Sequence, residues 1–271
     1  MDNIFDISDK IVVVTGGAGV LCGGMARGLA KAGAGIAVLD LNIEAAQAVA
    51  NEINQAGGRA IAVECNVLDK ESIEAACVAA EAKLGSVNVL INGAGGNKKE
   101  ATTSPEMPFF DIPAEAIRFV FDLNLIGTVL PSQVFGKAIA QNGNGVILNI
   151  SSMNAMRPLT KIAAYSAAKA AVSNFTQWLA VHMCQNYSTD VRVNAIAPGF
   201  FLTEQNRFLL TQESGDLTAR GQQIIDHTPM GRFGEADELL GCVHWLISDA
   251  AKFVTGIVVP IDGGFSAFSG V

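Results

Sequence analysis

The sequence predicts an α/β fold in which a doubly wound parallel sheet of about seven strands forms one Rossmann-type domain over residues 1–271. Short runs rich in valine and isoleucine alternate with alanine-rich segments of helical length. Most of these runs are apolar throughout, as strands are when helices cover both faces of a parallel sheet.

The expected strands follow one another at fairly regular intervals. They span residues 11–15, 36–40, 60–64, 87–92, 146–150, 191–196 and 257–261. Amphipathic patterns between them predict helices over 44–56, 70–84 and 163–185. Two polar segments, 95–113 and 199–233, interrupt the alternation after strand ends, where open α/β sheets bind ligands. We expect them to form the wall of a site and, around 199–233, its lid.

Composition and charge exclude several classes of function. Half of the residues are hydrophobic and 16% are charged, which favours a large core over disorder. The net charge of -8 and the lack of a basic stripe argue against nucleic acid or an anionic membrane as a partner. No apolar run approaches the roughly 18 residues of a membrane span, and the N-terminus lacks a secretory signal. We therefore expect a soluble, cytoplasmic protein.

The five cysteines are scattered singly. No Cys-x-x-Cys pair occurs, and the three histidines do not cluster with the cysteines. This pattern predicts reduced thiols, without a disulfide framework and without a metal.

Tyr165 and Lys169 carry the clearest chemical signal. They stand four residues apart in an alanine-rich helical pattern, which places both side chains on one helix face. A nearby ammonium favours the phenolate and is expected to lower the pKa of the phenol from about 10. Tyr165 is therefore a candidate proton donor and acceptor, and Ser152 precedes it by thirteen residues.

A glycine cluster follows the first expected strand. Gly16, Gly17 and Gly19 allow the backbone to pass close to a pyrophosphate, and the N-terminus of the next helix supplies N–H donors. A purely structural turn is the alternative interpretation. The position between strand and helix favours phosphate binding.

Asp40 ends the second expected strand. A carboxylate there can accept hydrogen bonds from both ribose hydroxyls and repels a 2′-phosphate. Leu41 and Asn42 follow, with no arginine or lysine to bind that phosphate, so NAD (NADH) is favoured and NADP is disfavoured. The alternative is that Asp40 only caps the next helix.

These motifs occur in a specific order. Along the chain they are Thr15-Gly16, Asn92-Gly93-Ala94-Gly95, Asn124, Ser152, Tyr165-x-x-x-Lys169 and Pro198-Gly199. With them, the chain resembles the short-chain dehydrogenase/reductase family over nearly its whole length. The resemblance implies a nicotinamide-dependent oxidoreductase acting on CH–OH groups. It also implies a homotetramer built through the helices after the fourth and fifth strands.

The resemblance further implies roles for single residues. Ser152 would hydrogen-bond the substrate oxygen, Tyr165 would pass the proton, and Lys169 would bind the nicotinamide ribose. Asn124 would hold a water that links Lys169 to solvent. The implied cofactor contacts are Gly16, Gly17, Gly19, Val20, Leu21, Asp40, Leu41, Asn66, Val67, Asn92, Gly93, Ala94, Tyr165, Lys169, Pro198, Gly199, Phe201 and Thr203.

Three positions depart from the family pattern. Val20 and Cys22 stand where the family has the second and third glycines of its phosphate turn, and Gly93 replaces an asparagine. A side chain at position 20 or 22 is expected to crowd the helix–strand contact or the phosphate approach. These two residues favour a hypothesis of another class, a dinucleotide-binding regulatory protein without turnover.

Polar and basic side chains are expected to converge on the substrate. The candidates are Asn97, Lys98, Asn154, Arg157, Gln205 and Arg207. Such a cleft suits a hydroxylated, anionic substrate better than a steroid or fatty chain, although Lys98 fits equally well as a solvated loop charge.

Three segments indicate a branch of the family. Residues 95–106, 194–210 and 225–234 look like sequences of D-mannonate oxidoreductases (fructuronate reductases). This resemblance implies interconversion of D-mannonate and D-fructuronate. Another sugar-acid or polyol dehydrogenase, such as a gluconate 5-dehydrogenase type, is the alternative.

Overall fold

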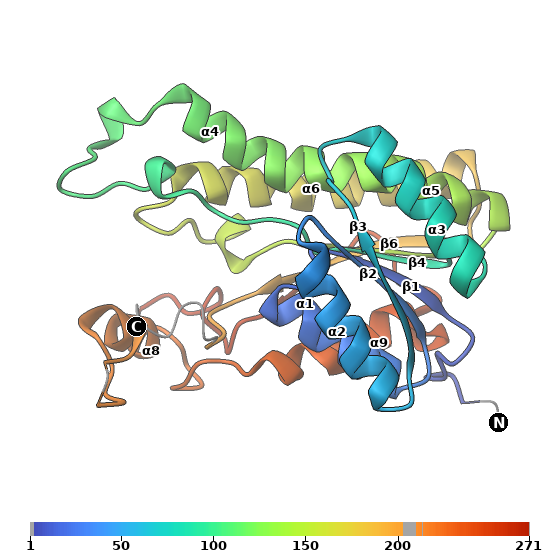
Figure 1. Ribbon diagram of the computed structural model, residues 1–271. Helices are drawn as coiled ribbons and strands as arrows, with labels where there is room; N and C mark the ends of the chain where they lie inside the picture. Colours follow the sequence, from blue (N-terminus) through green and yellow to red (C-terminus); the bar gives the residue numbers. More distant parts are fainter. Residues whose placement is uncertain (1–2, 203–209, 213, 271) are drawn as a thin grey trace.

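A seven-stranded parallel sheet forms the centre of the computed structural model, which describes residues 3–202, 210–212 and 214–270. The strand order is β3-β2-β1-β4-β5-β6-β7. The chain starts at β1 inside the sheet, adds β2 and β3 towards one edge, and then returns to place β4 on the other side of β1 (Figure 1). From β4 it adds strands towards the opposite edge. The strands are β1 Ile11–Thr15, β2 Gly35–Asp40, β3 Arg59–Glu64, β4 Val89–Asn92, β5 Gly145–Ile150, β6 Val191–Pro198 and β7 Val258–Ile261. The predicted doubly wound sheet is confirmed.

Helices cover both faces of the sheet. Those in the described ranges are α1 Val20–Lys31, α2 Ile43–Gln55, α3 Lys70–Leu84, α4 Ala114–Phe121, α5 Gly127–Asn142, α6 Ala163–Asn186, α8 Ala219–Asp226 and α9 Leu240–Ile247. Short 3₁₀ segments add η1 Lys99–Ala101, η2 Phe109–Asp111, η4 Met153–Ala155, η5 Ala236–Leu239 and η6 Asp249–Ala251. The three helices expected from sequence match α2, α3 and α6 to within one residue at each end.

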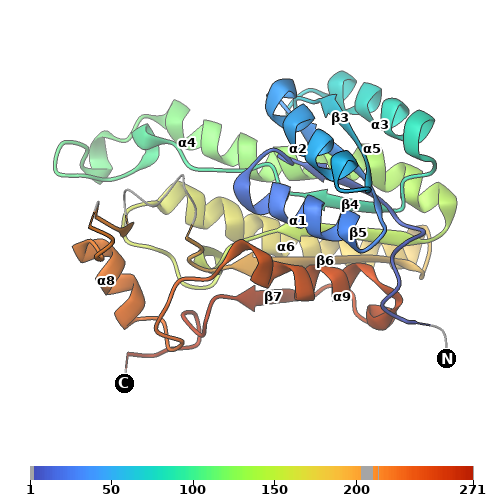
Figure 2. The same ribbon diagram turned by 60° about the horizontal axis from the view of Figure 1, so that its bottom comes forward.

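The side chains of β1 alternate between two cores. Val12 and Val14 pack in the core that α1, α2 and α9 cover, whereas Val13 packs in the core under α3, α5 and α6. Figure 1 shows these two helical layers on opposite sides of the strands, and Figure 2 brings the layer with α1, α2 and α9 forward. Because both faces of the strand are buried, its sequence is apolar from Ile11 to Val14.

A π-turn, η3 Asp122–Ile126, joins α4 to α5 in one helical stretch from residue 114 to 142. By length and mean hydropathy this stretch could cross a membrane, although charged residues such as Asp122 break it, so it holds no unbroken apolar run of about 18 residues. Its most apolar window is 44% buried, and α5 packs on α3 and on the sheet while α4 packs on α6. The hydropathy of this helix is thus explained by its place in the domain.

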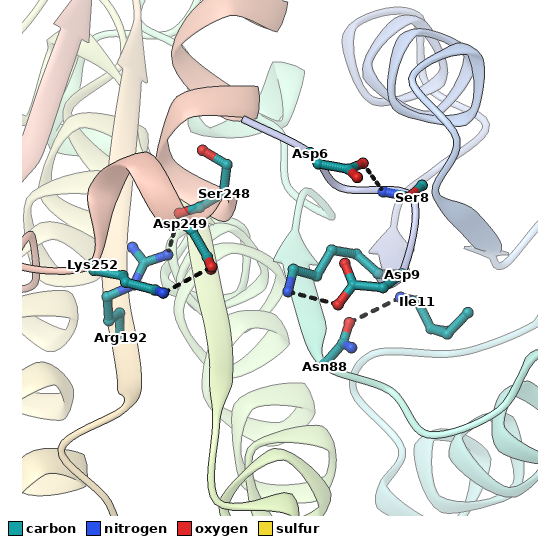
Figure 3. Close-up of polar contacts among 10 residues, drawn as sticks. Asp6, Ser8, Asp9, Ile11, Asn88, Arg192, Ser248, Asp249 and Lys252 are labelled. Carbon is teal, nitrogen blue, oxygen red and sulfur yellow. Dashed lines mark hydrogen bonds and ion pairs between the residues drawn. The ribbon is translucent and has the colours of Figure 1, made fainter. Parts of the chain in front are cut away.

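Arg192, near the start of β6, joins the amino end of that strand to the end of α9 (Figure 3). Its guanidinium donates to the carbonyl of Leu246 at 2.7 Å and to that of Ser248 at 3.0 Å, at the C-terminus of α9. A cation at this helix end is favoured by the helix dipole. Burial lowers the pKa of Arg192, and the nearby Asp249 partly opposes that effect.

The carboxyl ends of the strands point the other way. The long loop before α4, helix α8 and the C-terminal segment all extend from this end of the molecule (Figure 1). Ligands bind at this edge in open α/β sheets, next to the point where the strand order reverses. Here that point lies between β1 and β4.

Candidate active site

Ser152, Tyr165 and Lys169 meet at the carboxyl end of β5. Ser152 lies two residues beyond the strand, and its hydroxyl accepts the N–H of Asn154 at 3.2 Å, which caps η4. Tyr165 and Lys169 lie in the first two turns of α6. The Lys169 ammonium donates to the carbonyl of Ile150 at 2.8 Å and lies 5.7 Å from the centre of the Tyr165 ring. The fold thus brings all three predicted catalytic side chains together.

The protein environment shifts the pKa of both ionisable groups. Burial raises the pKa of the Tyr165 phenol above 10, and the Ser152 hydroxyl only partly opposes this. Burial lowers the pKa of Lys169 to about 8. The pKa of the phenol is therefore raised and not lowered as expected, and burial is the largest cause.

Asn124 is fully buried in the π-turn. Its amide donates to the carbonyls of Gly96 and Val120, both at 2.7 Å, and its oxygen accepts the Gly96 N–H at 3.2 Å. A π-turn places a side chain out of the regular helical register, and such turns are frequent at functional sites. Asn124 thereby holds the segment after β4 in place.

Gly95 keeps a space open between Asn124 and Lys169. A Cβ at position 95 would lie 2.8 Å from the Asn124 amide oxygen and 3.1 Å from the Lys169 nitrogen. Both separations are hydrogen-bond distances. A side chain at position 95 would therefore crowd both polar groups, and glycine lets the segment after β4 pass close to Asn124 and Lys169.

The Asn92 side chain points into the protein. Its amide donates to the Ser132 hydroxyl at 2.9 Å and to the Asn149 oxygen at 2.8 Å, and Asn149 donates in turn to Thr176 at 2.9 Å. All four side chains are buried. The side chain therefore steadies the sheet, and this geometry does not fit the implied cofactor contact through the Asn92 side chain.

The turn after β1 approaches the segment after β4 closely. Gly16 has φ 62°, and a Cβ there would lie 2.8 Å from the Cα of Ala94. Gly17 is equally confined, with the Val14 carbonyl 2.8 Å from its Cβ position. Gly19 precedes α1, and no described side chain caps that helix. Close backbone packing and free N–H groups at a helix N-terminus fit a diphosphate.

Asp40 lies beside this turn. One carboxylate oxygen accepts the N–H of Ala18 at 3.1 Å and the other accepts the N–H of Asn42 at 3.0 Å. The cap of α2 is Asn42, which accepts the N–H of Ala45 at 3.0 Å, so the alternative interpretation of Asp40 as the cap is wrong. A carboxylate has about four acceptor sites, which leaves Asp40 able to accept from ribose hydroxyls.

Other expected cofactor residues surround the same edge. Val20 opens α1 and Leu41 is 68% exposed beside Asp40, whereas Val67 is buried against Gly127. The Asn66 oxygen already accepts the N–H of Leu68 at 3.0 Å.

The remaining cofactor candidates lie in α1, at the end of β6 or just beyond that strand. Leu21 packs partly buried against the core. Pro198 ends β6, and Gly199 donates to the carbonyl of Ile261 at 2.9 Å. Phe201 is buried against Gly234. Thr203 lies outside the described residues.

The substrate candidates divide into three groups. Asn154 is buried beside Ser152, and its side-chain oxygen has no hydrogen-bond partner. Asn97 donates to Thr102 at 2.8 Å, and the Lys98 ammonium lies 4.8 Å from the centre of the Phe119 ring. Gln205 and Arg207 lie outside the described residues.

Arg157 has a different neighbour from the one expected. Its guanidinium donates to the carbonyl of Ser266 at 3.0 Å, and Asp262 accepts the N–H groups of Gly264 and Ser266, both at 2.9 Å. Arg157 therefore holds the C-terminal segment beside the Ser152 loop. Sequence reasoning missed this contact because it spans 109 positions and no local pattern marks it.

The C-terminal segment also packs on the expected lid. The Phe265 ring lies 5.2 Å from that of Phe200 and 6.4 Å from the ring of His227. The segment from residue 262 onward thus joins the Ser152 loop to the region before α9.

Comparisons with known proteins agree with this geometry. A family model described as enoyl-(acyl carrier protein) reductase matches residues 19–266. A structure from Haemophilus influenzae, named as a candidate D-mannonate oxidoreductase with bound NAD, is 49% identical with a TM-score of 0.93, over 99% of this chain and 100% of that one. A Burkholderia cenocepacia gluconate 5-dehydrogenase in complex with NADP and tartrate is 29% identical with a TM-score of 0.86, over 97% and 98%.

The same comparisons include an enzyme with a different kind of substrate. The 7alpha-hydroxysteroid dehydrogenase of Escherichia coli strain K12 is 32% identical over 95% of this chain and 94% of its own length. Family membership alone therefore does not select a sugar acid. The chain belongs to the short-chain dehydrogenase/reductase family and is an oxidoreductase.

Proposed function

We propose that the protein is an NAD(H)-dependent oxidoreductase that interconverts a secondary alcohol and a ketone on a sugar acid, with D-mannonate and D-fructuronate as the pair. The observation that carries the reaction is the convergence of Ser152, Tyr165 and Lys169 at the edge that holds the glycine turn and Asp40. The choice of sugar acid and of NAD draws support from the relative with bound NAD.

In the proposed mechanism, the nicotinamide coenzyme supplies or accepts the hydride. The Ser152 hydroxyl holds the substrate oxygen, and the Tyr165 hydroxyl exchanges a proton with it. Lys169 remains largely an ammonium at neutral pH because its pKa is about 8. Asn124, whose amide oxygen lies near Gly95 as the Lys169 nitrogen does, would hold the water that links Lys169 to solvent.

Asn154 supports a hydroxylated substrate. A buried carbonyl oxygen without a partner costs free energy, about 1–3 kcal/mol, until a donor reaches it. Asn154 lies two residues from Ser152, so a hydroxyl next to the reacting carbon would be within its reach after a small adjustment of η4. A steroid offers few such donors. We also propose that residues 199–233 form the lid over this position, within one domain.

A substrate panel tests this proposal. D-mannonate, D-gluconate, D-mannitol and a 7alpha-hydroxysteroid are each offered with NAD and with NADP, and formation of the reduced coenzyme is followed by absorbance. We expect D-mannonate with NAD to give the highest kcat/KM. Higher values for D-gluconate would favour the gluconate 5-dehydrogenase alternative, and higher values for the steroid would contradict a sugar acid altogether.

Asp40→Ala tests the preference for NAD. We expect weaker NADH binding and a smaller ratio between the NADPH and NADH dissociation constants, because the ribose hydroxyls lose their acceptor. One lost hydrogen bond to a charged group is worth about 1.5–3 kcal/mol, or about 10- to 100-fold in affinity. Glu64→Ala is the matched control, since Glu64 pairs with Asp40 in the sheet register and is exposed. Tighter binding of NADPH to the unaltered protein would contradict the assignment.

We infer in addition that the protein works in the cytoplasm as a homotetramer. Its five cysteines are free, which agrees with a reducing compartment. Trp178, Val181 and Tyr187 expose more than half of their surface on and just after α6, and Trp178 stacks on His182 at 4.7 Å. Such an apolar face suits a subunit contact. A monomeric mass by light scattering would contradict the assembly.

A further inference from the structure

Two departures from the family pattern lie in contact. Cys22 is in the first turn of α1, and Gly93 is the first residue after β4. A Cβ at position 93 would overlap the Cys22 sulfur, while the Cβ of Cys22 would lie 3.5 Å from the same point, an ordinary contact distance. The sulfur therefore fills the volume that a side chain at position 93 would need.

The sulfur lies between the first turn of α1 and the segment after β4, and both belong to the proposed dinucleotide site. The N–H groups of Gly93 and Ala94 lie 3.1 and 3.3 Å from the Thr15 hydroxyl, which accepts from both. The turn after β1 and the segment after β4 are thus joined on one side by Thr15. Cys22, a residue of α1, contacts the same segment from the helix and is only 6% exposed.

The Cys22 thiol can act as a steric spacer, but its surroundings do not suit a nucleophilic or redox role. Burial raises the pKa of Cys22 to about 12, so it stays neutral at any physiological pH. Reactive cysteines are thiolates in electropositive, accessible surroundings, and Cys22 is neither ionised nor accessible. The Lys169 ammonium lowers its pKa and the Asp40 carboxylate raises it, and both effects are smaller than that of burial.

We propose that Cys22 and Gly93 form one steric unit that sets the separation between the first turn of α1 and the segment after β4, and that this unit tunes affinity for the dinucleotide. Cys22 is accordingly a positioning residue. The inference rests on the proposed binding of a nicotinamide dinucleotide. It converts two departures, each of which should weaken the site, into a pair that compensate each other.

A double-mutant cycle tests the proposal with NADH as the probe. Gly93→Ala, Cys22→Ala and the double variant are titrated by NADH fluorescence, and their thermal midpoints are recorded. Gly93→Ala is expected to weaken NADH binding by a factor at least about tenfold larger when Cys22 is present than when position 22 is alanine. The carbonyl of Thr15, 2.7 Å from the Cβ position, obstructs both backgrounds equally and cancels in the cycle.

Cys77→Ala provides the control. Cys77 is a buried cysteine of α3 in the other core, so its change is expected to add to that of Gly93→Ala without coupling. An equal penalty for Gly93→Ala whether position 22 holds cysteine or alanine overturns the proposal. So does coupling confined to the thermal midpoint, because packing alone explains that result.

Failure to fold also decides the question. If Gly93→Ala yields no folded protein, then adding Cys22→Ala must restore folding, because the sulfur obstructs position 93 more closely than the Thr15 carbonyl does. A double variant that stays unfolded overturns the steric unit. If the unaltered protein binds neither NADH nor NADPH, it is the proposed function that fails.

Discussion

Tyr165→Phe is expected to remove most turnover while leaving NADH binding intact. General acid–base catalysis contributes about 100- to 10,000-fold, and phenylalanine keeps the ring but loses the proton. The change should lower kcat by that factor and alter the NADH dissociation constant less than about threefold, which is under 1 kcal/mol. Steady-state kinetics with D-mannonate and fluorescence titration with NADH measure the two quantities.

The second tyrosine of the chain supplies the control. Tyr187 is 61% exposed just beyond α6, so Tyr187→Phe is expected to leave kcat unchanged. Retention of more than about a tenth of the activity by Tyr165→Phe would remove this residue from the proton transfer, given the expected size of the effect.

Because the pKa of Tyr165 is raised, we expect oxidation and reduction to depend on pH differently. At neutral pH the buried phenol is protonated, so it is ready to donate a proton during reduction. Oxidation requires the phenol to give up its proton first. We therefore expect kcat for oxidation to rise with pH through the neutral range, and kcat for reduction to change less.

The sheet could be predicted from sequence because its strands are buried on both faces. Val12, Val13 and Val14 leave no polar position, and this continuous pattern marks a covered parallel strand. The candidate catalytic residues could be predicted from the sequence equally well. Tyr165 and Lys169 are paired by their helical spacing, and Ser152 was selected by its place thirteen residues before Tyr165 and by the family resemblance.

The environment of those residues could not be predicted in the same way. Desolvation of Tyr165 depends on what packs over it, which local spacing does not encode. Arg157 was assigned to the substrate from its charge, yet it binds the distant Ser266. Asn92 was assigned to the cofactor from its motif, yet its side chain completes a buried network.

Lys169→Met is expected to change how stability depends on pH. In the folded protein the Lys169 pKa is about 8, whereas an unfolded lysine keeps its proton to about 10.5. Unfolding therefore takes up a proton between these two values, and Lys169 makes the folded state more stable as pH rises through that window. The full effect is about 3 kcal/mol, of which about 1 kcal/mol falls between pH 7 and pH 9.

The measurement is the free energy of unfolding by urea at pH 7 and pH 9 for both proteins. Stability of the unaltered protein minus that of Lys169→Met should rise by about 1 kcal/mol over this interval. Comparison with the variant cancels buried thiols such as Cys65, whose raised pKa of about 11 acts in the opposite direction. Lys83→Met, on an exposed position of α3, should give a flat difference. A flat or falling difference for Lys169→Met would show that the ammonium is not desolvated in the folded protein, and with it the proposed electrostatics of the site would fail.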